Sequence, residues 1–252
     1  MSKLVYVAID DTDNSESRGT GSMARELAAR LQKLRLGRKL GVTRHQLLVD
    51  PQIPYTSHNS CACIPMEVAD GQAPEPEVLA KEAVAFLTKE AAPGSDAGLC
   101  VAEASHVTPE VIDFGKRAKR EVLTAEEAHS IAKAAGIHLS GLTGERIGVI
   151  GSLAAVGLHH TGEDGWFLEF NGVHRLEGCM TAAMLQRIGI ERFQPENGHA
   201  SPEPDDLVTI GERTKALLRH GSPTLLIERV EAPEAPTQWQ AASKERIRQL
   251  SN

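Results

Sequence analysis

The sequence VAIDDTDNSESRGTGSM, residues 7–23, changes from an apolar run to three closely spaced aspartates and then to a glycine-rich segment. The apolar run LVYVAI, residues 4–9, predicts a buried first strand. Asp10, Asp11 and Asp13 follow where this strand leaves its sheet. Like charges at this spacing repel one another, and burying an unpaired carboxylate costs several kcal/mol. We therefore expect a positively charged partner at this place.

Magnesium and phosphate chemistry fits these residue types. The end of a strand is where α/β folds place ligands, and magnesium binds through one or two carboxylates together with nucleotide phosphates. The glycines of RGTGS, residues 18–22, allow backbone amides to approach an anion at a helix start, and arginine adds a fixed positive group. The alternative is a surface turn at residues 13–15 followed by a helix that Ser22 caps. The metal–phosphate interpretation predicts Asp10, Asp11 and Asp13 as metal ligands and Thr12, Arg18, Gly19 and Gly21 as nucleotide-binding residues.

The composition of the chain is that of an ordinary globular protein. The 252 residues include 27 basic and 34 acidic side chains, a formal charge of −7, which argues against a broad nucleic-acid footprint. No apolar run reaches the roughly 18 residues of a membrane helix and no signal peptide precedes Leu4, so we expect a cytoplasmic protein. The cysteines fit no zinc ribbon, and Cys61 and Cys63 are expected on the buried face of one strand.

Short strands alternate with helices along the chain, which predicts an α+β fold with mixed sheets. A capping box at Thr124 opens one helix and Gly136 closes it, while Asn171-Gly172 predicts a hairpin. Residues 194–206 are expected to be a loop. The expected strands are 4–9, 45–50, 61–68, 97–104, two around Asn171, 207–210 and 224–230, and further helices are expected at 22–36, at 76–90 and after Thr108-Pro109.

Two further segments carry candidate site residues. In the loop DPQIPYTSHNS, residues 50–60, His58 and Asn59 follow the rigid Pro54-Tyr55 and are placed to meet a phosphate or a substrate; an ordinary surface loop is the alternative. In IGVIGSLAAVG, residues 147–157, Gly151 either lets a nucleotide approach the backbone or serves tight packing of a helix on a sheet. His159 and His160 are expected on a strand, facing opposite sides, which argues against a metal pair.

Several motifs, in order, resemble the archaeal tRNA-isoleucine agmatinylcytidine synthetase family. They are IDDTD with the following Arg-Gly and a small hydroxyl residue, DPQIPYTSHNS, GKRAKREVLTAEEA followed by IGVIGSLAAVG, and HGSPTLLIERVE. The resemblance extends across roughly residues 4–231. It implies a kinase-like region at 1–50 and 105–230 and a ferredoxin-like region at 45–104. The remaining C-terminal tail, 231–252, is expected from the residues themselves to be a frayed linker with a short helix.

The resemblance also implies a chemistry. The family splits ATP to AMP and pyrophosphate while it joins agmatine to a tRNA cytidine; the cytosine oxygen is phosphorylated and the amine then displaces it. A family threonine soon after the Arg-Gly becomes phosphorylated during turnover; by alignment Ser22 takes its place, with Thr20 as the nearby competitor. We therefore expect an enzyme that uses ATP and Mg²⁺, with a small amine as a possible substrate.

The sequence departs from the family in the parts that hold tRNA. The family carries an OB-fold and a zinc ribbon after its catalytic half, and this sequence ends before either would fit. In TSHNSC, residues 56–61, His58 is the one basic residue, so the usual electrostatic attraction for RNA is weakened. We expect a stand-alone relative whose acceptor is open. The alternatives are a non-catalytic nucleotide or metabolite-binding protein and an RNA modifier that requires a partner protein.

Overall fold

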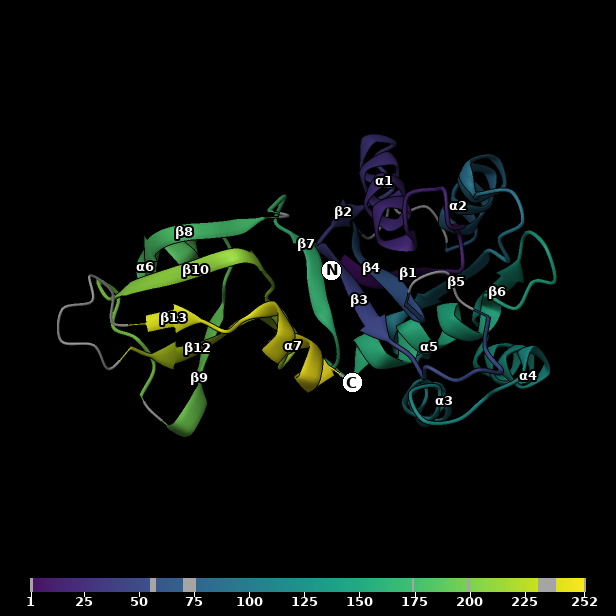
Figure 1. Cartoon of the computed structure of the whole chain (residues 1–252). Coiled ribbons are helices and arrows are strands. Elements are labelled where there is room, and N and C mark those ends of the chain that lie inside the picture. Colours follow the sequence, from purple (N-terminus) through teal and green to yellow (C-terminus); the bar gives the residue numbers. More distant parts are fainter. Residues whose placement is uncertain are drawn as a thin grey trace. The chain divides into compact units, whose positions relative to one another are not determined.

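The computed structural model describes residues 2–54, 58–69, 76–173, 175–198, 200–230 and 239–251 (Figure 1). The chain divides into two compact units, Met1–Thr161 (unit 1) and Gly162–Asn252 (unit 2). The expected α+β class with mixed strand pairing is confirmed: the parallel pairs lie in unit 2, and the strand pairs within unit 1 that the structure describes are antiparallel.

Unit 1 begins with a βαββαβ arrangement. Its sheet has the order β5-β1-β4-β3, with the short β2 beside β4. This order, from β1 to β5, matches the ferredoxin-like pattern. The expected division into a ferredoxin-like region at 45–104 and a kinase-like region at 1–50 and 105–230 stays a prediction. The elements are β1 (Ser2–Asp10), α1 (Thr20–Lys33), β2 (Arg38–Lys39), β3 (Gly41–Gln46), β4 (Ser60–Ala69), α2 (Pro76–Glu90) and β5 (Gly98–Glu103).

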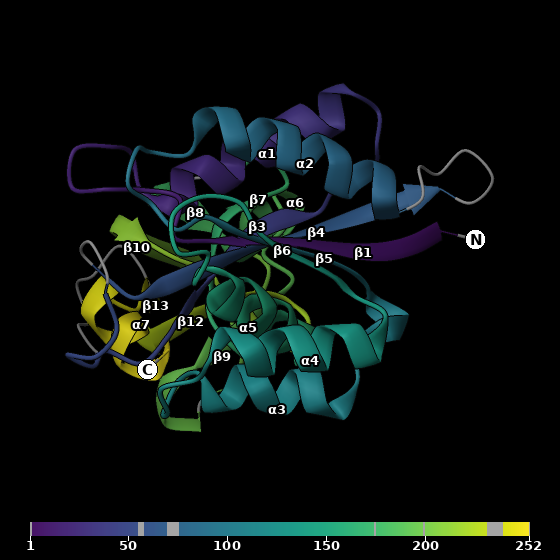
Figure 2. The ribbon, with the colours of Figure 1, turned by 90° about the vertical axis from the view of Figure 1, so that its right-hand side faces the viewer.

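The second half of unit 1 covers the other face of this sheet. Figure 2 shows α1 and α2 on one face and α3, α4 and α5 on the opposite face. The cap signals of α4 are confirmed: the Thr124 hydroxyl accepts the Glu127 amide at 3.2 Å, and Gly136 ends the helix with φ of 67°. The elements are a short 3₁₀ turn (Ala104–His106), α3 (Pro109–Arg117), α4 (Ala125–Ala135), β6 (His138–Gly141), which pairs with β5, and α5 (Val149–His160).

Alternation along β1 decides which side chains meet α5. Tyr6 and Ala8 belong to the hydrophobic cluster that contains the buried residues of α5. Because side chains alternate between faces, Asp10 projects to the same side at the end of the strand. Cys61 and Cys63 of β4 lie in this cluster, as expected.

The C-terminal end of α5 carries the two histidines that were expected on a strand, and that prediction was wrong. His159 is buried, and its Nδ1 is 2.8 Å from the Thr43 hydroxyl, which also lies 2.9 Å from Nε2 of His45. His160 Nδ1 lies 3.3 Å from the Tyr6 hydroxyl. The apolar run IGVIGSLAAVGL is helical because it is buried between the sheet and α3, where a helix satisfies its own backbone groups.

Unit 2 is a strand-rich unit with its own core. Its strands follow the order β7-β11-β12-β13-β10-β8, and β9 adds to β12 in parallel. Aromatic and aliphatic side chains such as Phe167, Phe170 and Trp239 fill its core. The elements are β7 (Trp166–Phe170), β8 (Leu176–Thr181), α6 (Ala182–Arg187), β9 (Arg192–Pro195), a 3₁₀ turn (Glu196–Gly198), β10 (Leu207–Thr214), β11 (Leu217–Arg219), β12 (Ser222–Arg229), β13 (Trp239–Ala241) and α7 (Lys244–Ser251).

Several sequence predictions need correction. Asn171 and Gly172 make a tight turn with φ of 46° and 77°, but beyond the Phe170–Val173 bridge no hairpin follows, because β7 pairs with β11 and β8 with β10. The strand expected at 45–50 is shifted: β3 ends at Gln46. Within the expected loop 194–206, β9 reaches Pro195, and within the expected tail β13 pairs with β10 and β12. Among the described helices, none is long and apolar enough to cross a membrane.

Candidate functional site

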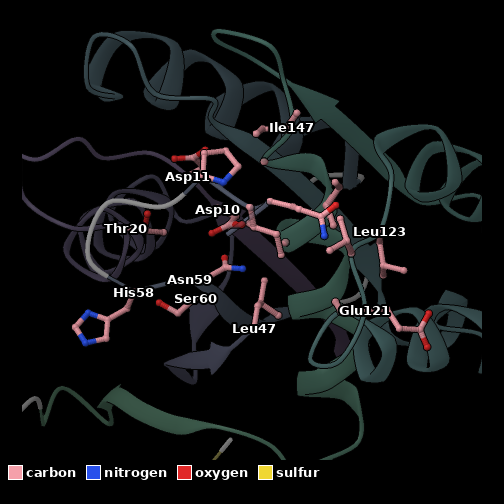
Figure 3. A pocket seen from close by; sticks show the side chains of 18 of the residues that line it. Asp10, Asp11, Thr20, Leu47, His58, Asn59, Ser60, Glu121, Leu123 and Ile147 are labelled. Atoms are coloured by element: carbon pink, nitrogen blue, oxygen red, sulfur yellow. The ribbon is translucent and has the colours of Figure 1, made fainter. Parts of the chain in front are cut away.

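A cavity of about 210 Å³ opens in unit 1 at the end of β1. Four parts of the chain that are distant in sequence form its wall: the β1–α1 loop, residues within 47–54 and 58–60, the connection between α3 and α4, and the start of α5. Figure 3 shows Thr20 at one end and Leu123 at the opposite end, with Asp10 between them. The β1–α1 loop therefore forms a polar end of the cavity. At the opposite end Glu121 lies beside Leu123, but aliphatic side chains predominate there, and we call it the apolar end.

The three predicted aspartates all line the polar end. Asp10 is the last residue of β1, and Asp11 has φ of 49°, a left-handed conformation that is uncommon for a residue with a side chain. Such backbone strain persists where the surrounding structure holds the residue in place, and it clusters at functional sites. The turn at Asp11 directs the chain away from the sheet, so that Asp13 lies beside the start of α1.

Burial and mutual repulsion make two of these carboxyls weak acids. Burial, followed by the charge of Asp11, raises the pKa of Asp10 to about 8. Burial, followed by the charges of Asp96 and Asp13, raises the pKa of Asp11 to about 6. A cation among these oxygens would reverse both effects, because an opposite charge favours the ionised form.

We expect Asp10→Asn to stabilise the metal-free protein at pH 8. The folded state holds a proton on Asp10 up to about pH 8, whereas the unfolded chain releases it near 3.8, so this carboxyl costs stability increasingly as the pH rises between these values. The variant removes that cost, about 2 kcal/mol after allowance for partial solvent exposure, or roughly 4–8 °C in Tm.

Thermal melting in EDTA at pH 5 and pH 8 checks this expectation. The advantage of the variant should shrink as the pH falls towards 4. Asp113→Asn, at an exposed position of α3, is the matched control and should leave the pH profile unchanged. If the melting temperatures of wild type and Asp10→Asn changed equally with pH, the burial of the Asp10 carboxyl would not lower the stability of the protein, and this expectation would be wrong.

Glycines of α5 make room for Asp10. A β-carbon at Gly151 would overlap the Asp10 carboxylate, and one at Gly148 would overlap the Asp96 carbonyl oxygen. Both alternatives for Gly151 thus meet at one place: it provides tight packing of α5 on the sheet, and it also lines the cavity. No local pattern links residues 10 and 151, so only the packing of α5 against β1 reveals the pair.

A hydrogen-bonded cluster joins the acidic loop to α1. The Thr20 hydroxyl donates to Asp13 Oδ1 at 2.6 Å, and the Thr20 amide donates to the same oxygen at 3.1 Å. The buried Thr12 hydroxyl donates to Thr20 Oγ1 at 3.1 Å. Thr12 therefore does not line the cavity wall but positions Thr20, which does.

The remaining residues of RGTGS take different places. Helix α1 begins at Thr20 with Gly19 as its N-cap, so the interpretation of Ser22 as the cap is wrong, and Ser22 does not line the cavity. Arg18 is exposed and forms an ion pair with Glu26. Gly19 and Gly21 line a smaller neighbouring cavity. Of the predicted site residues in this segment, the structure brings Thr20 alone to the main cavity.

The loop before β4 contributes part of the wall. Pro54, His58 and Asn59 all line the cavity, while Tyr55 lies outside the described residues. The Asn59 side chain donates to the Leu48 carbonyl at 2.6 Å, so it also holds the loop in place. Ser60, the first residue of β4, lies at the cavity as well.

The apolar residues of the cavity wall were not predicted as site residues. They come from three segments, and all of them except Leu47 lie within motifs that carry the family resemblance. Membership of those motifs is the signal that could have pointed to them. The apolar lining residues are Leu47, Ile53, Ala118, Val122, Leu123, Ile147 and Ile150.

The donor set fits a metal ion that arrives with phosphate. Across the residues that the structure describes, no group of three or more histidine, cysteine, aspartate or glutamate side chains is arranged to hold a metal ion by itself. Magnesium, however, commonly binds through one or two carboxylates and completes its shell with water and substrate phosphates. The carboxylates of Asp10 and Asp11, both destabilised as anions, suit that role.

Comparisons with known proteins place this geometry in context. No family model matches the chain. An uncharacterized protein of Methanocaldococcus jannaschii is 31% identical over 159 residues, which are 62% of this chain and 51% of the relative. The isoleucine-tRNA 2-agmatinylcytidine synthetase TiaS of Pyrococcus horikoshii is 28% identical over 156 residues, which are 61% of this chain and 35% of the synthetase.

This chain is homologous to TiaS. The crystal structure of TiaS in complex with isoleucine tRNA and ATP shares the fold with a TM-score of 0.52 at 24% identity, over 62% of this chain and 36% of that one. The chain thus spans about half the length of the M. jannaschii protein and about a third of TiaS. The resemblance inferred from the motifs is confirmed over about 62% of the chain; its extension across residues 4–231 stays a prediction.

Proposed function

We propose that this chain binds ATP with Mg²⁺ in the main cavity and uses it to activate an acceptor oxygen by phosphorylation, so that an amine can displace that oxygen. The observation that carries the proposal is the division of one cavity into an apolar end and an end with three carboxylates and a hydroxyl, in a chain homologous to TiaS. TiaS itself has been crystallised with ATP and an isoleucine tRNA.

The apolar end suits the adenine ring. Aliphatic side chains such as Leu47, Leu123 and Ile150 line the cavity and would offer apolar contact to a flat base. Binding pockets of this kind are mainly apolar and contain a few polar groups that fix orientation. With the base at this end, the triphosphate extends along Gly151 towards Asp10 and Thr20.

The polar end suits a triphosphate only when a cation accompanies it. The negative charges of the phosphates would meet the carboxylates of Asp10, Asp11 and Asp13, so the anions need a divalent ion between them. When bound, magnesium neutralises charge on the phosphate oxygens and orients the phosphoryl group. Asp10 and Asp11 would hold it, while Asp13 remains bonded to Thr20.

Thr20 is the hydroxyl that we propose for transient phosphorylation. Its proton is directed at Asp13, which is placed to accept it as the oxygen attacks phosphorus. Thr20 lines the cavity and Ser22 does not, so geometry favours Thr20 over the position given by alignment. Arg18, with its exposed partner Glu26, has no part in this arrangement.

The acceptor and the amine are the less defined parts of the proposal. TiaS is named for the addition of agmatine to a tRNA cytidine, and the sequence matches extend over only about a third of that protein. The net charge of −7 makes broad electrostatic attraction of tRNA weak. We therefore propose a small amine as the nucleophile, with tRNA as one candidate acceptor, in a cytoplasmic enzyme.

Analysis of the nucleotide product tests this function. The full chain is incubated with radiolabelled ATP, magnesium and a panel of amines including agmatine, with and without tRNA, and products are separated by chromatography. Attack of the acceptor oxygen on the α-phosphorus releases pyrophosphate, and displacement of that oxygen by the amine then releases AMP. Transfer of the γ-phosphoryl group to Thr20 releases ADP instead. We therefore expect AMP and pyrophosphate as the products of complete turnover with acceptor and amine, and ADP when Thr20 alone is phosphorylated. Tight ATP binding without any turnover would instead favour the non-catalytic nucleotide-binding alternative.

A further inference from the structure

A second, smaller cavity of about 80 Å³ lies beside the main one. The two cavities share Asp13, Thr20, His58 and Ser60, so they adjoin along the wall that contains Thr20. The smaller cavity is completed by Gly19 and Gly21 at the start of α1, by Arg44 of β3, and by residues 61–62 of β4.

Strand register explains why Arg44 lies at this cavity. Thr43 pairs with Cys63 and projects to the α5 side, where its hydroxyl meets His159. Arg44 pairs with Ala62 and therefore projects to the opposite face, towards the start of α1. The sheet thus places Arg44, which is half-buried, in the wall of the cavity that Thr20 also lines.

The chemistry of this wall selects the ligand. A guanidinium offers only donors, in a planar arrangement that matches the two oxygens of a carboxylate or phosphate. Ser60 and His58 add further polar groups that can donate hydrogen bonds. Asp13 places one carboxylate on the same wall, but its Oδ1 accepts two hydrogen bonds from Thr20. An oxyanion therefore fits on the Arg44 side of the cavity.

The volume limits what can enter. The smaller cavity, at about 80 Å³, has less than half the volume of the main cavity, at about 210 Å³. It therefore suits a small anionic group better than a second nucleotide.

We propose that the smaller cavity is the acceptor subsite and that Arg44 binds an oxyanion group, carboxylate or phosphate, of the acceptor. This inference rests on the proposed function, because an acceptor can be activated at Thr20 only if the main cavity binds ATP. It goes further than the proposed function by naming the chemical class: the acceptor carries an anionic group close to the oxygen that is activated. Arg44 is then a residue that determines specificity.

Anion binding can be measured without ATP. The full chain in EDTA is titrated with inorganic phosphate and, separately, with acetate, and binding is followed by calorimetry and by NMR of the Thr20 amide. Arg44→Met should weaken binding of the preferred anion at least tenfold, whereas Arg44→Lys, which keeps the charge but loses the planar fork, should weaken it less. Arg38→Met, at an exposed strand arginine paired with Glu67, is the matched control and should bind as wild type does.

The outcomes separate the two proposals. Loss of anion binding in Arg44→Met, together with wild-type melting behaviour of Arg44→Lys, supports the subsite, and the stronger of the two anions identifies carboxylate or phosphate as the group. Anion affinities that are equal in wild type and Arg44→Met overturn it, even if ATP binds. ATP binding is measured in a parallel titration, and its absence contradicts the proposed function. The anion affinities of wild type and Arg44→Met test the anion site separately, whatever the result with ATP.

Discussion

Replacing Asp11 by asparagine is expected to weaken ATP binding on the order of 100-fold in magnesium-containing buffer and far less in EDTA. The substitution keeps the shape of the side chain and removes the negative charge that the metal requires. Asparagine still offers a carbonyl oxygen, but without charge it cannot offset the cost of removing water from magnesium. Calorimetric titration with a non-hydrolysable ATP analogue, with and without the metal, provides the comparison.

The pH dependence of the same titration gives an independent check. Metal binding requires the ionised carboxylate, and the pKa of Asp11 is raised to about 6 by burial and by the charges of Asp96 and Asp13. Wild-type affinity in magnesium should therefore increase from pH 5 to pH 7, and the increase should be smaller in Asp11→Asn. Asp113→Asn serves as the control for a carboxylate on the surface. If Asp11→Asn bound ATP in magnesium as tightly as wild type does in magnesium, a metal ligand at this residue would be excluded.

Replacing Thr20 by valine is expected to abolish phosphate labelling of the protein by γ-labelled ATP. Valine has the shape of threonine but lacks the hydroxyl that donates to Asp13. The loss of these hydrogen bonds costs about 1–3 kcal/mol of stability, so Thr20→Ser, which keeps the hydroxyl, is measured beside it and should retain labelling. Mass spectrometry of the tryptic peptide from Gly19 to Arg25 locates the modification.

Ser22→Ala distinguishes the two hydroxyls. Because Ser22 lies inside α1 and does not line the cavity, this variant should be labelled as wild type is. Labelling that persists in Thr20→Val and disappears in Ser22→Ala would assign the phosphate to Ser22 and contradict the geometry. A wild-type protein that is never labelled would remove the covalent step from the proposed function.

Local patterns in the sequence were sufficient for many elements. The capping box at Thr124 and the left-handed Gly136 bound α4 as predicted, because both act through backbone groups within one helical turn. The alternation of Cys61 and Cys63 placed both on one buried face, since side chains in a strand change sides at every residue. The acidic loop was also predicted from a local pattern, because the three aspartates follow directly after an apolar strand in the sequence.

Other features depended on partners that are distant in sequence. The turn at Asn171-Gly172 formed, yet β7 and β8 pair with β11 and β10, because burial of the core of unit 2 outweighs local hairpin preference. His159 and His160 lie on a helix because the long apolar run before them is buried between α3 and the sheet. Strand and helix cannot be distinguished by periodicity alone in a run that is apolar on every side.

The acidic loop, the α+β class and the family resemblance could all be inferred from the sequence, since each is carried by neighbouring residues or by motifs in a fixed order. The folded structure was needed to show that Thr20, and not Ser22, lies beside Asp13. It also decided that Gly151 makes room for Asp10 and that Leu47, Leu123 and Ile150 form one apolar wall. The physical reason is that these contacts arise when helices pack on opposite faces of a sheet, and packing brings together side chains that no local spacing relates.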